Sequence, residues 1–287
     1  MSIGILYESK EWSSYYLEKC ISDMGLTARL IDMQGEIDEG ELLSYKLIAN
    51  RMPGSAGFRG HQKSLDRTPA VIELLKNNGV PMINTYETHF YETSKELSTK
   101  TLAARGFPVP AVYCVCHPAQ MAENTEIEYP CIVKPDCGGR TNCTFIVGSR
   151  KELGEIMKNV PNIKFIAEEY IVPELGFLTR VEVIGRSCRS VLKKGIAENG
   201  LAAYHLGSVF EAYPEVGAKV KNSAVDIMDM LKIEAGSMDI IENNSGFYVI
   251  DINSVSNASE DNIETFKFDL IKETAEYIVG KYKKLCL

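Results

Sequence analysis

Two aspartates and an asparagine in the last quarter of the chain have the spacing of a metal-binding site. They belong to the segment 236–254, GSMDIIENNSGFYVIDINS, in which two strand-like runs flank the turn residues NNSG. A hairpin with a three-residue Asn-Ser-Gly loop, its glycine in the left-handed conformation, would be centred on Ser245. Asp239 then lies directly opposite Asp251, and Asn253 follows two residues later on the same face.

The two opposed carboxylates would lie about 5 Å apart and repel each other unless a positive charge lay between them. Two carboxylates and one amide oxygen form a hard ligand set that suits Mg²⁺, which keeps its other positions for water and phosphates. An exposed sheet edge with incidental acids is the alternative. The neighbouring residues are apolar and favour a partly buried site: Ile240, Ile241, Val249, Ile250 and Ile252.

A second chemical feature is a lysine that leaves a strand-like run and enters a glycine-containing loop. The run YPCIVK ends at Lys134, and Gly138, Gly139 and Arg140 follow. An ammonium group and an accessible loop backbone both suit phosphate binding. A plain turn in which Asp136 pairs with Lys134 is the commoner explanation of such a segment by itself.

A third feature is the run 164–185, KFIAEEYIVPELGFLTRVEVIG, in which one strand ends in two glutamates and a turn leads to a second strand. Arg180 and Glu182 lie two residues apart and therefore on one face of that second strand. Alternating charges usually mark a solvent-exposed face, so this pattern alone does not indicate a site.

Three successive parts of the chain are predicted to position these residues: 1–92, 93–170 and 171–287. The first part alternates apolar strand runs with helical spacing, which is typical of a parallel sheet covered on both faces. Its predicted strands are 3–7, 27–31, 45–49 and 81–84, and its predicted helices are 12–24 and 68–77, the latter with Pro69 in its first turn.

The second part is predicted to contain a helix that begins at Thr93 or Ser94 and ends at Arg105, strands at 111–116, 129–133 and 144–147, and a capped helix at 149–159. The third part is predicted to contain strands at 178–184 and 189–192, a helix at 218–231, the hairpin at 236–253 and a helix at 268–285. The expected fold class is α/β, with α+β character in the C-terminal part.

The composition limits the partners that the chain can have. The 287 residues are 45% hydrophobic and 24% charged, and their net charge of −8 disfavours duplex nucleic acid and anionic lipid as main partners. No apolar run approaches the roughly 20 residues of a membrane span, and no secretory signal is visible. The eight cysteines are scattered, which is typical of reduced core thiols. We expect a cytoplasmic protein that acts on small molecules, without a nucleic-acid or membrane partner; whether it forms a homo-oligomer is left open.

Taken in order along the chain, these segments resemble the ATP-grasp ligases, and within them the branch of the ribosomal protein S6 glutamate ligase and the LysX-type enzymes. The resemblance implies an ATP-grasp fold of three domains, in which an N-terminal parallel-sheet domain precedes two α+β lobes that clasp ATP. It rests on SKELSTKTLAARGFPVP at 94–110, YPCIVKPDCGG at 129–139, EEYI at 168–171, RVEVIG at 180–185, and MDII followed by VIDINS at 238–254.

The resemblance implies a nucleotide-binding role for five of the matching residues. Lys95 and Lys134 would contact the phosphates of ATP. The backbone of Glu169, Tyr170 and Ile171 would bind the edge of the adenine ring.

The resemblance also assigns the metal and the catalytic residue. Asp239, Asp251 and Asn253 would bind Mg²⁺, with Mn²⁺ as a second option, which agrees with the ligand set that the hairpin pattern predicts. Arg180 would stabilise an acylphosphate or the tetrahedral oxyanion.

The substrate-binding residues are predicted on two loops. Arg51 follows a strand in LIANRMPGSAGFRGH, which resembles a family loop near the acceptor pocket, and His61 of the same loop is a weaker candidate. The polar run after the metal strand places Ser254, Ser256 and Asn257 in the wall of that pocket.

Two departures from the family pattern affect the nucleotide contacts. Leu178 stands where close relatives have an acidic residue for the ribose hydroxyls, and Glu174 is the predicted replacement. The stretch 201–203 is apolar where several relatives are basic or polar, so Lys193 is the predicted additional phosphate contact, with Lys194 and His205 as further candidates.

The resemblance implies an ATP-dependent carboxylate–amine ligase that forms an amide or peptide bond through an acylphosphate and releases ADP and phosphate. Its substrates would be a small-molecule carboxylate and an amine, such as amino acids or peptides. A non-catalytic ATP-binding or scaffold protein that retains the fold is the alternative. A third hypothesis is phosphorylation or carboxylation of a small acid without amide formation.

Overall fold

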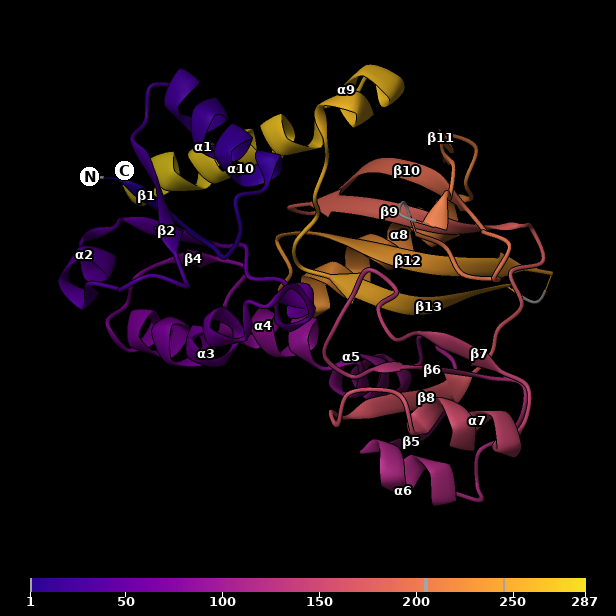
Figure 1. Cartoon of the computed structure of the whole chain (residues 1–287). Coiled ribbons are helices and arrows are strands. Elements are labelled where there is room, and N and C mark those ends of the chain that lie inside the picture. Colours follow the sequence, from indigo (N-terminus) through magenta and orange to yellow (C-terminus); the bar gives the residue numbers. More distant parts are fainter. Residues whose placement is uncertain (1, 204–205, 245) are drawn as a thin grey trace.

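The computed structural model describes residues 2–203, 206–244 and 246–287, and it contains three β-sheets with helices packed on them (Figure 1). The first sheet is parallel, with the strand order β2-β1-β3-β4. Its strands are β1 (Ile3–Tyr7), β2 (Ala28–Asp32), β3 (Leu47–Asn50) and β4 (Met82–Ile83). Apolar side chains pack on both faces of this sheet. The prediction of a parallel sheet covered on both sides is confirmed.

The helices of this first part connect its strands and pack on both faces of the sheet. Residues of α3 pack with Leu6 and Ile48 of the sheet. The elements are α1 (Trp12–Asp23), α2 (Glu39–Ser44), the 3-10 turn η1 (Gly54–Arg59), α3 (Gln62–Asn77) and α4 (Tyr86–Thr93). The predicted start of the helix at 68 was wrong, because α3 already begins at Gln62 and contains Pro69 in its interior. Its first turns carry polar residues on most positions, so apolar spacing gave no signal there.

The second sheet is antiparallel, with the order β5-β8-β6-β7. Its elements are β5 (Val112–Cys116), α6 (Pro118–Glu123), β6 (Cys131–Pro135), β7 (Phe145–Val147), α7 (Arg150–Met157) and β8 (Phe165–Glu169). Apolar residues of α6 and α7 cover one face. Helix α5 (Lys95–Ala104) precedes this sheet, close to the predicted start, and its cap is Ser94, whose hydroxyl accepts a hydrogen bond from the backbone N–H of Leu97.

The third sheet is also antiparallel and has the order β11-β10-β9-β12-β13. Its strands are β9 (Phe177–Ile184), β10 (Ser187–Gly195), β11 (Phe210–Ala212), β12 (Ala235–Asn243) and β13 (Gly246–Asn253). Helix α8 (Ala218–Met230) covers one face with Val220, Ala224 and Ile227. The other face carries the polar residues of the predicted site. The mixed architecture confirms the α/β fold class with antiparallel sheets in the later parts.

The hairpin of β12 and β13 pairs Asp239 with Asp251, as predicted. Its turn is shorter than expected, because Asn243 pairs with Gly246, and Ser245 lies outside the described residues. A β-bulge between the Asp239 and Ile240 pairs adds one residue to β13 and restores the register. The prediction of the opposed acids is therefore confirmed, although the predicted three-residue loop was wrong.

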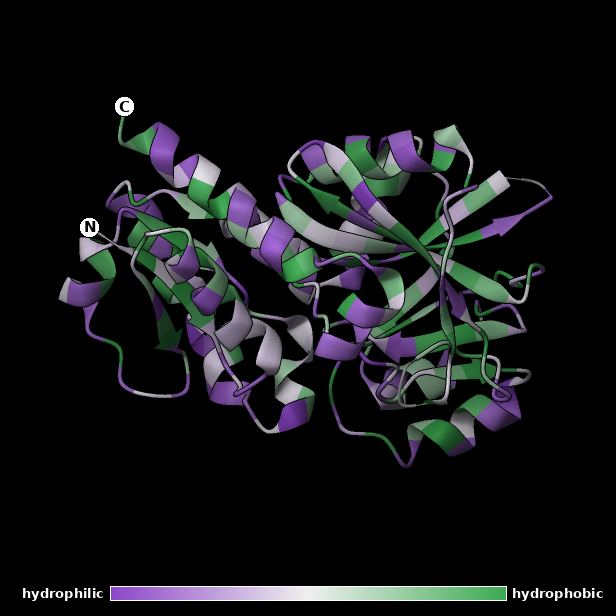
Figure 2. Cartoon of the chain, turned by 90° about the horizontal axis from the view of Figure 1, so that it is seen from above, coloured by the Kyte–Doolittle hydropathy of each residue, from purple (hydrophilic) through white to green (hydrophobic). Residues whose placement is uncertain are grey.

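The last helix departs from the predicted division of the chain. After α9 (Glu260–Phe266), helix α10 (Leu270–Leu285) returns to the first sheet and packs against α1 and β1. Figure 2 shows that hydrophobic and hydrophilic residues alternate along α10, and its buried residues include Ile271, Ala275 and Ile278. The third part was predicted as 171–287, but α10 belongs structurally to the N-terminal core. None of the described helices is both long and apolar enough to cross a membrane.

Candidate active site

Two connected cavities lie against the open face of the third sheet. The inner cavity has a volume of about 150 Å³ and lies between the second and third sheets. The outer cleft has a volume of about 580 Å³ and extends toward α1 and α9. The residues that line both cavities mark their junction: Gly138, Gly139, Arg140, Lys194, Ala203, Asp239 and Asp251.

The opposed acids lie at this junction with cationic partners. Asp239 is 4% exposed, and its carboxylate accepts hydrogen bonds from Lys194 Nζ at 2.9 Å and Arg180 Nη1 at 3.2 Å. Burial would raise the pKa of Asp239, but Lys194 and Arg180 outweigh this effect and lower it. Arg180 also donates from Nε to Glu182 at 2.7 Å, so the charged pair predicted on one face of β9 is a buried ion pair. Asp239 is therefore ionised.

Lys95 and Lys134 extend from the second part of the chain into the inner cavity, and Lys95 contacts two residues of the junction. Lys95 Nζ lies 3.2 Å from Asp251 and donates to the Gly138 carbonyl at 3.0 Å. Burial would lower the pKa of Lys95, but Asp251 raises it above its usual value. Lys134 Nζ lies 2.7 Å from Glu168 and donates to the Ile250 carbonyl at 2.9 Å. Both lysines line the inner cavity.

The alternative in which Asp136 pairs with Lys134 was wrong. Asp136 instead accepts hydrogen bonds from the backbone N–H of Glu96 at 2.7 Å and from the Ser94 hydroxyl at 3.1 Å, at the start of α5. An acid in the first turn is favourable because of the unpaired N–H groups there. Asp136 thus fixes the helix that carries Lys95.

The rest of the inner cavity is largely apolar. Glu169, Tyr170 and Ile171, the predicted hinge residues, lie in its wall where β8 ends. Apolar side chains surround them: Ile132, Leu178, Ile196, Ala202, Ile241 and Ile250. An apolar slot that is also lined by Lys95, Lys134 and Lys194 can hold a flat ring and place a phosphate chain beside these lysines.

Comparisons with known proteins agree with this arrangement. Residues 92–278 match the model of the RimK-like ATP-grasp domain, which covers more than half of the chain. The chain belongs to the RimK-like ATP-grasp family. The suspected resemblance and the expected ATP-grasp fold are confirmed. No curated protein matches the chain by sequence.

Solved structures of ATP-grasp proteins share the fold over almost the whole chain. A RimK domain protein from Sphaerobacter thermophilus is 16% identical, with a TM-score of 0.73 over 96% of this chain and 99% of its own. The D-alanine–D-alanine ligase of Bacillus anthracis is 16% identical, with a TM-score of 0.71 over 99% of each chain. The ATP-grasp ligase PsnB, complexed with minimal precursor, Mg and ADP, is 16% identical, with a TM-score of 0.66 over 98% of each chain.

The oxygen donors of this ATP-grasp chain fit a hard divalent cation. Asp239 and Asp251 face each other, and Asn253 follows on the same strand and also lines the outer cleft. Within the described ranges there is no group of three or more His, Cys, Asp and Glu residues that could hold a metal. Two carboxylates with an amide oxygen suit Mg²⁺, which keeps further positions for water and phosphates. Asp239, Asp251 and Asn253 are therefore the residues that would hold it.

The structure brings Lys194, and not Lys193, to the junction. Alternation along β10 places Lys193 on the opposite face of the sheet, where its ammonium lies 5.2 Å from the Phe177 ring centre and 4.9 Å from that of Tyr213. The prediction that Lys193 contacts phosphate is therefore corrected in favour of Lys194, which contacts Asp239. The register of β10 would have been needed to choose between them. His205 lies outside the described residues.

The predicted ribose contact is also absent from the inner cavity. Glu174 is exposed, and its carboxylate accepts a hydrogen bond from the Asn244 side chain at 3.1 Å, near the hairpin turn. The cavity wall at this end is formed by Pro173 and Leu178. The predicted role of Glu174 in ribose binding is thus corrected, because Glu174 contacts the hairpin turn instead.

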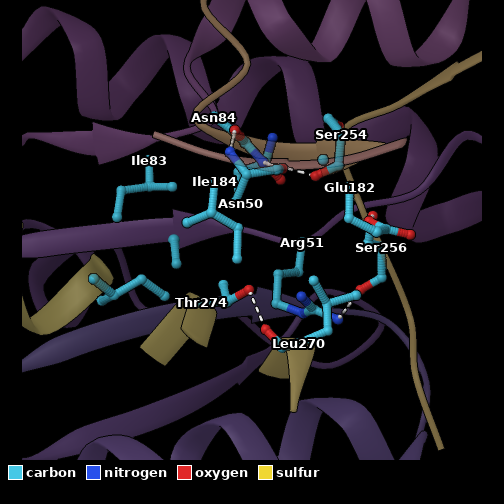
Figure 3. A pocket seen from close by; sticks show the side chains of 14 residues that line it. Asn50, Arg51, Ile83, Asn84, Glu182, Ile184, Ser254, Ser256, Leu270 and Thr274 are labelled. Atoms are coloured by element: carbon cyan, nitrogen blue, oxygen red, sulfur yellow. Dashed lines mark hydrogen bonds between the residues drawn. The ribbon is translucent and has the colours of Figure 1, made fainter. Parts of the chain in front are cut away.

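Arg51 lies behind the loop 254–257 and does not line the outer cleft. Its guanidinium donates from Nη2 to Asn257 Oδ1 at 2.9 Å and to the Ser256 carbonyl at 3.3 Å. It lines a small cavity of about 20 Å³, which Figure 3 shows with Ser256 beside Arg51. Burial lowers the pKa of Arg51 to about 10. Arg51 holds the loop from behind, and only Asn257 of the three loop residues faces the outer cleft.

The small cavity contains two buried donors without a protein partner among the described residues. They are Nε of Arg51 and Nδ2 of Asn50. A cavity of about 20 Å³ has room for a single water molecule, which can accept both hydrogen bonds. Figure 3 shows these residues on the side of the cavity formed by the first sheet. The cavity is too small for a substrate.

Ser254 and Ser256 are tied to buried acids. The Ser254 hydroxyl donates to Glu92 at 3.0 Å, and the Ser256 hydroxyl donates to Glu182 at 2.6 Å. Burial raises the pKa of Glu92, although hydrogen bonds from Gly54 and Ser254 oppose this effect. These contacts make the loop a fixed wall.

Glu11 is a residue that sequence reasoning missed. Its carboxylate forms ion pairs with Arg59 and with Arg140 of the glycine-containing loop, and it accepts from Asn257 Nδ2 at 2.8 Å. His61, a weaker substrate candidate, pairs with Glu8 and does not line the outer cleft. Glu11 thus connects the N-terminal part with the glycine-containing loop and with the loop 254–257. Glu11 directly precedes α1, and a glutamate at such a position does not indicate from the sequence alone that it will contact distant segments.

Proposed function

We propose that this protein is an ATP-dependent carboxylate–amine ligase that forms an amide or peptide bond through an acylphosphate. The observation that carries the proposal is the junction of the two cavities. An apolar slot with three lysines meets a larger cleft at a pair of opposed aspartates. This arrangement suits a nucleotide on one side and its phosphoryl acceptor on the other.

The nucleotide would occupy the inner cavity. Its ring would lie between the apolar side chains, with the backbone of residues 169–171 along its edge. Lys95 and Lys134 would neutralise its phosphates, with Lys194 in the place first given to Lys193. Mg²⁺, or Mn²⁺, held by Asp239, Asp251 and Asn253 would neutralise the remaining phosphate charge.

The chemistry requires no nucleophilic side chain. A carboxylate oxygen of one substrate attacks the γ-phosphorus, and the bond from that phosphorus to the β–γ bridging oxygen breaks to release ADP. The amine nitrogen of the second substrate then attacks the acyl carbon, loses a proton and displaces phosphate. Catalysis rests on positioning and on charge stabilisation.

Arg180 is the proposed catalytic residue. It lines the outer cleft beside Asp239, and Glu182 and Asp239 raise its pKa above its usual value although burial opposes this. A permanently charged guanidinium can bind a carboxylate in bidentate fashion and stabilise the charge that develops on it. The Glu182 contact from Nε fixes its orientation.

The family and the neighbours support this proposal. The chain belongs to the RimK-like ATP-grasp family, and one structural neighbour is named a D-alanine–D-alanine ligase. Another, PsnB, is described as a ligase with Mg and ADP bound. These names apply to those proteins, and they make the ligase reaction the first one to test.

The test is the release of ADP and phosphate from Mg·ATP by the purified protein across a panel of amino acids and small peptides. We expect release that requires both a carboxylate and an amine, together with an amide product by mass spectrometry. ¹⁸O in the substrate carboxylate should appear in the released phosphate. Binding of ATP without ADP release for any pair would instead support a non-catalytic nucleotide-binding protein, which the apolar Leu178 in the inner cavity would suit.

A further inference from the structure

The charges of the outer cleft are unevenly distributed. Beyond the junction, the described residues of its lining include four carboxylates, Glu11, Glu92, Glu182 and Asp261, and one guanidinium, that of Arg180. Arg180 already contacts Glu182 and Asp239. Glu11 is paired with Arg59 and Arg140, and Glu92 and Glu182 are buried. A substrate with a second negative charge would therefore meet only cations that already have a carboxylate partner in this region of the described lining.

Apolar side chains from α1 and from the segment that follows β13 form a further part of the cleft lining. This outer wall consists of Trp12, Val255, Ala258, Phe266, Phe268 and Leu270. The Trp12 ring stacks on Tyr16 at 4.4 Å, and the Tyr16 hydroxyl donates to Asp269 at 2.8 Å. These contacts fix α1 against the segment that follows α9, so the outer wall is a supported surface.

Asp261 lies in the same part of the lining. It is exposed and forms no ion pair with the rest of the described chain. Glu264, on the same helix, is also exposed but does not line the cleft. The outer wall thus combines aromatic surface with an unpaired carboxylate, a combination that attracts an ammonium group on an apolar frame.

We infer that the amine substrate is a primary amine on an apolar or aromatic frame without a second carboxylate, and that Asp261 and the outer wall select it against acidic amines. The inference rests on the proposed function for the presence of an amine substrate. The cleft volume of about 580 Å³ leaves room for such a frame beside the reacting carboxylate. Rejection of acidic amines follows because like charges would be brought together without compensation.

Trp12 provides the measurement, because it is the single tryptophan of the chain and it lies in the outer wall. Its fluorescence is titrated with L-phenylalaninamide, L-alaninamide and L-glutamate in the presence of Mg·ADP. We expect phenylalaninamide to bind about tenfold or more tightly than glutamate, with alaninamide between them. Equal or tighter binding of glutamate, or no response to any of the three probes, would overturn the inference.

Two matched variants separate the role of Asp261 from a general charge effect. Asp261→Lys should reduce the preference for phenylalaninamide over glutamate by about tenfold, because it replaces an attractive charge with a repulsive one. Glu264→Lys makes the same change of charge outside the cleft and should leave the preference unchanged. Equal effects of the two variants would contradict the assignment.

The binding and turnover results distinguish the two proposals. Selective binding of aromatic amines without ADP release for any pair would contradict the ligase function and leave the binding preference intact. Turnover that is faster with acidic amines would support the ligase and contradict the preference.

Discussion

Asp251 and Asp239 are opposed in the sheet but differ in their partners. Asp239 contacts Lys194 and Arg180, whereas the one cation in contact with Asp251 among the described residues is Lys95. Asp251 is also more exposed, with a quarter of its side chain accessible. Asp251 is therefore the acid that is better placed to bind a metal ion together with phosphate.

Replacing Asp251 with Asn should remove most of the activity and little of the stability. We expect Mg·ATP-dependent ADP release to fall by about 100-fold or more, because the charge that balances the metal and Lys95 is lost. The measurement is steady-state ADP release, with urea unfolding to check the fold. Asp226→Asn, an exposed acid on α8, is the control. Activity within threefold of the parent would exclude Asp251 as a metal ligand.

His89 makes the stability of the protein dependent on pH. It is 2% exposed, its Nδ1 has no partner among the described residues, and burial lowers its pKa to about 4. The unfolded chain, with a histidine pKa of about 6.5, binds the extra proton between these two values. Stability therefore falls as the pH drops from about 6.5 toward 4.

Urea unfolding at pH 7.5 and pH 5 measures this effect. Between these pH values, His89 should contribute a loss of about 2 kcal/mol. His89→Gln, which does not titrate, should lose less than the parent by that amount. The same loss in parent and variant would show that other groups cause the pH dependence.

Residue types and strand alternation predicted much of the site. Asp239 and Asp251 are opposed, although the predicted turn was one residue too long, because the bulge compensates for the shorter turn. Whether the Lys194 side chain points to Asp239 depends on the register of β10. The position of Arg51 depends on how the N-terminal domain meets the loop 254–257. Neither of these is a local property of the sequence.

Helix α10 belongs to the N-terminal core although it lies far along the chain. Ile278 is 1% exposed and packs with the residues of β1 and α1. Ile278→Ala should lower the free energy of unfolding by about 3 kcal/mol, because it leaves a cavity in this core. Urea unfolding checks this, with Lys283→Ala on the exposed side of α10 as the control. A loss below about 1 kcal/mol would mean that α10 contributes little to the core.

Local patterns predict elements well and their partners poorly. Strand and helix alternation in the first part predicts its parallel sheet, since such connections favour that topology. The apolar stripe of α10 predicts a buried face, but the sequence does not specify which sheet covers it. The start of α3 was missed because its polar first turns lack apolar spacing.

The glycine-containing loop 138–142 joins the second part of the chain to the first. Arg140 and Thr141 have φ values of 58° and 55°, in the left-handed region that non-glycine residues rarely adopt. Arg140 is held there by its ion pair with Glu11. The loop is thus kept over the junction of the two cavities by a contact from another domain.

Glu11→Gln should release this loop. Loss of the charged contacts to Arg59 and Arg140 should raise the amide hydrogen exchange of residues 138–142 by about tenfold, because charge-assisted hydrogen bonds are lost. Mass spectrometry of the exchanged peptides measures this. Glu36→Gln, an exposed acid that does not line the cleft, serves as the control. Unchanged exchange would mean that the glycines alone set the position of the loop.

The packing of α10 on the first sheet also affects how the protein folds during synthesis. The core formed by β1 and α1 includes Ile271, Ala275 and Ile278 of α10. The roughly 180 residues that form the other two sheets therefore leave the ribosome after β1 and α1 and before α10. The second and third sheets contain their own hydrophobic clusters and can fold while the first still lacks its last helix. The N-terminal core would then be the last to close, and the outer cleft, which needs both Trp12 and Leu270, would form with it.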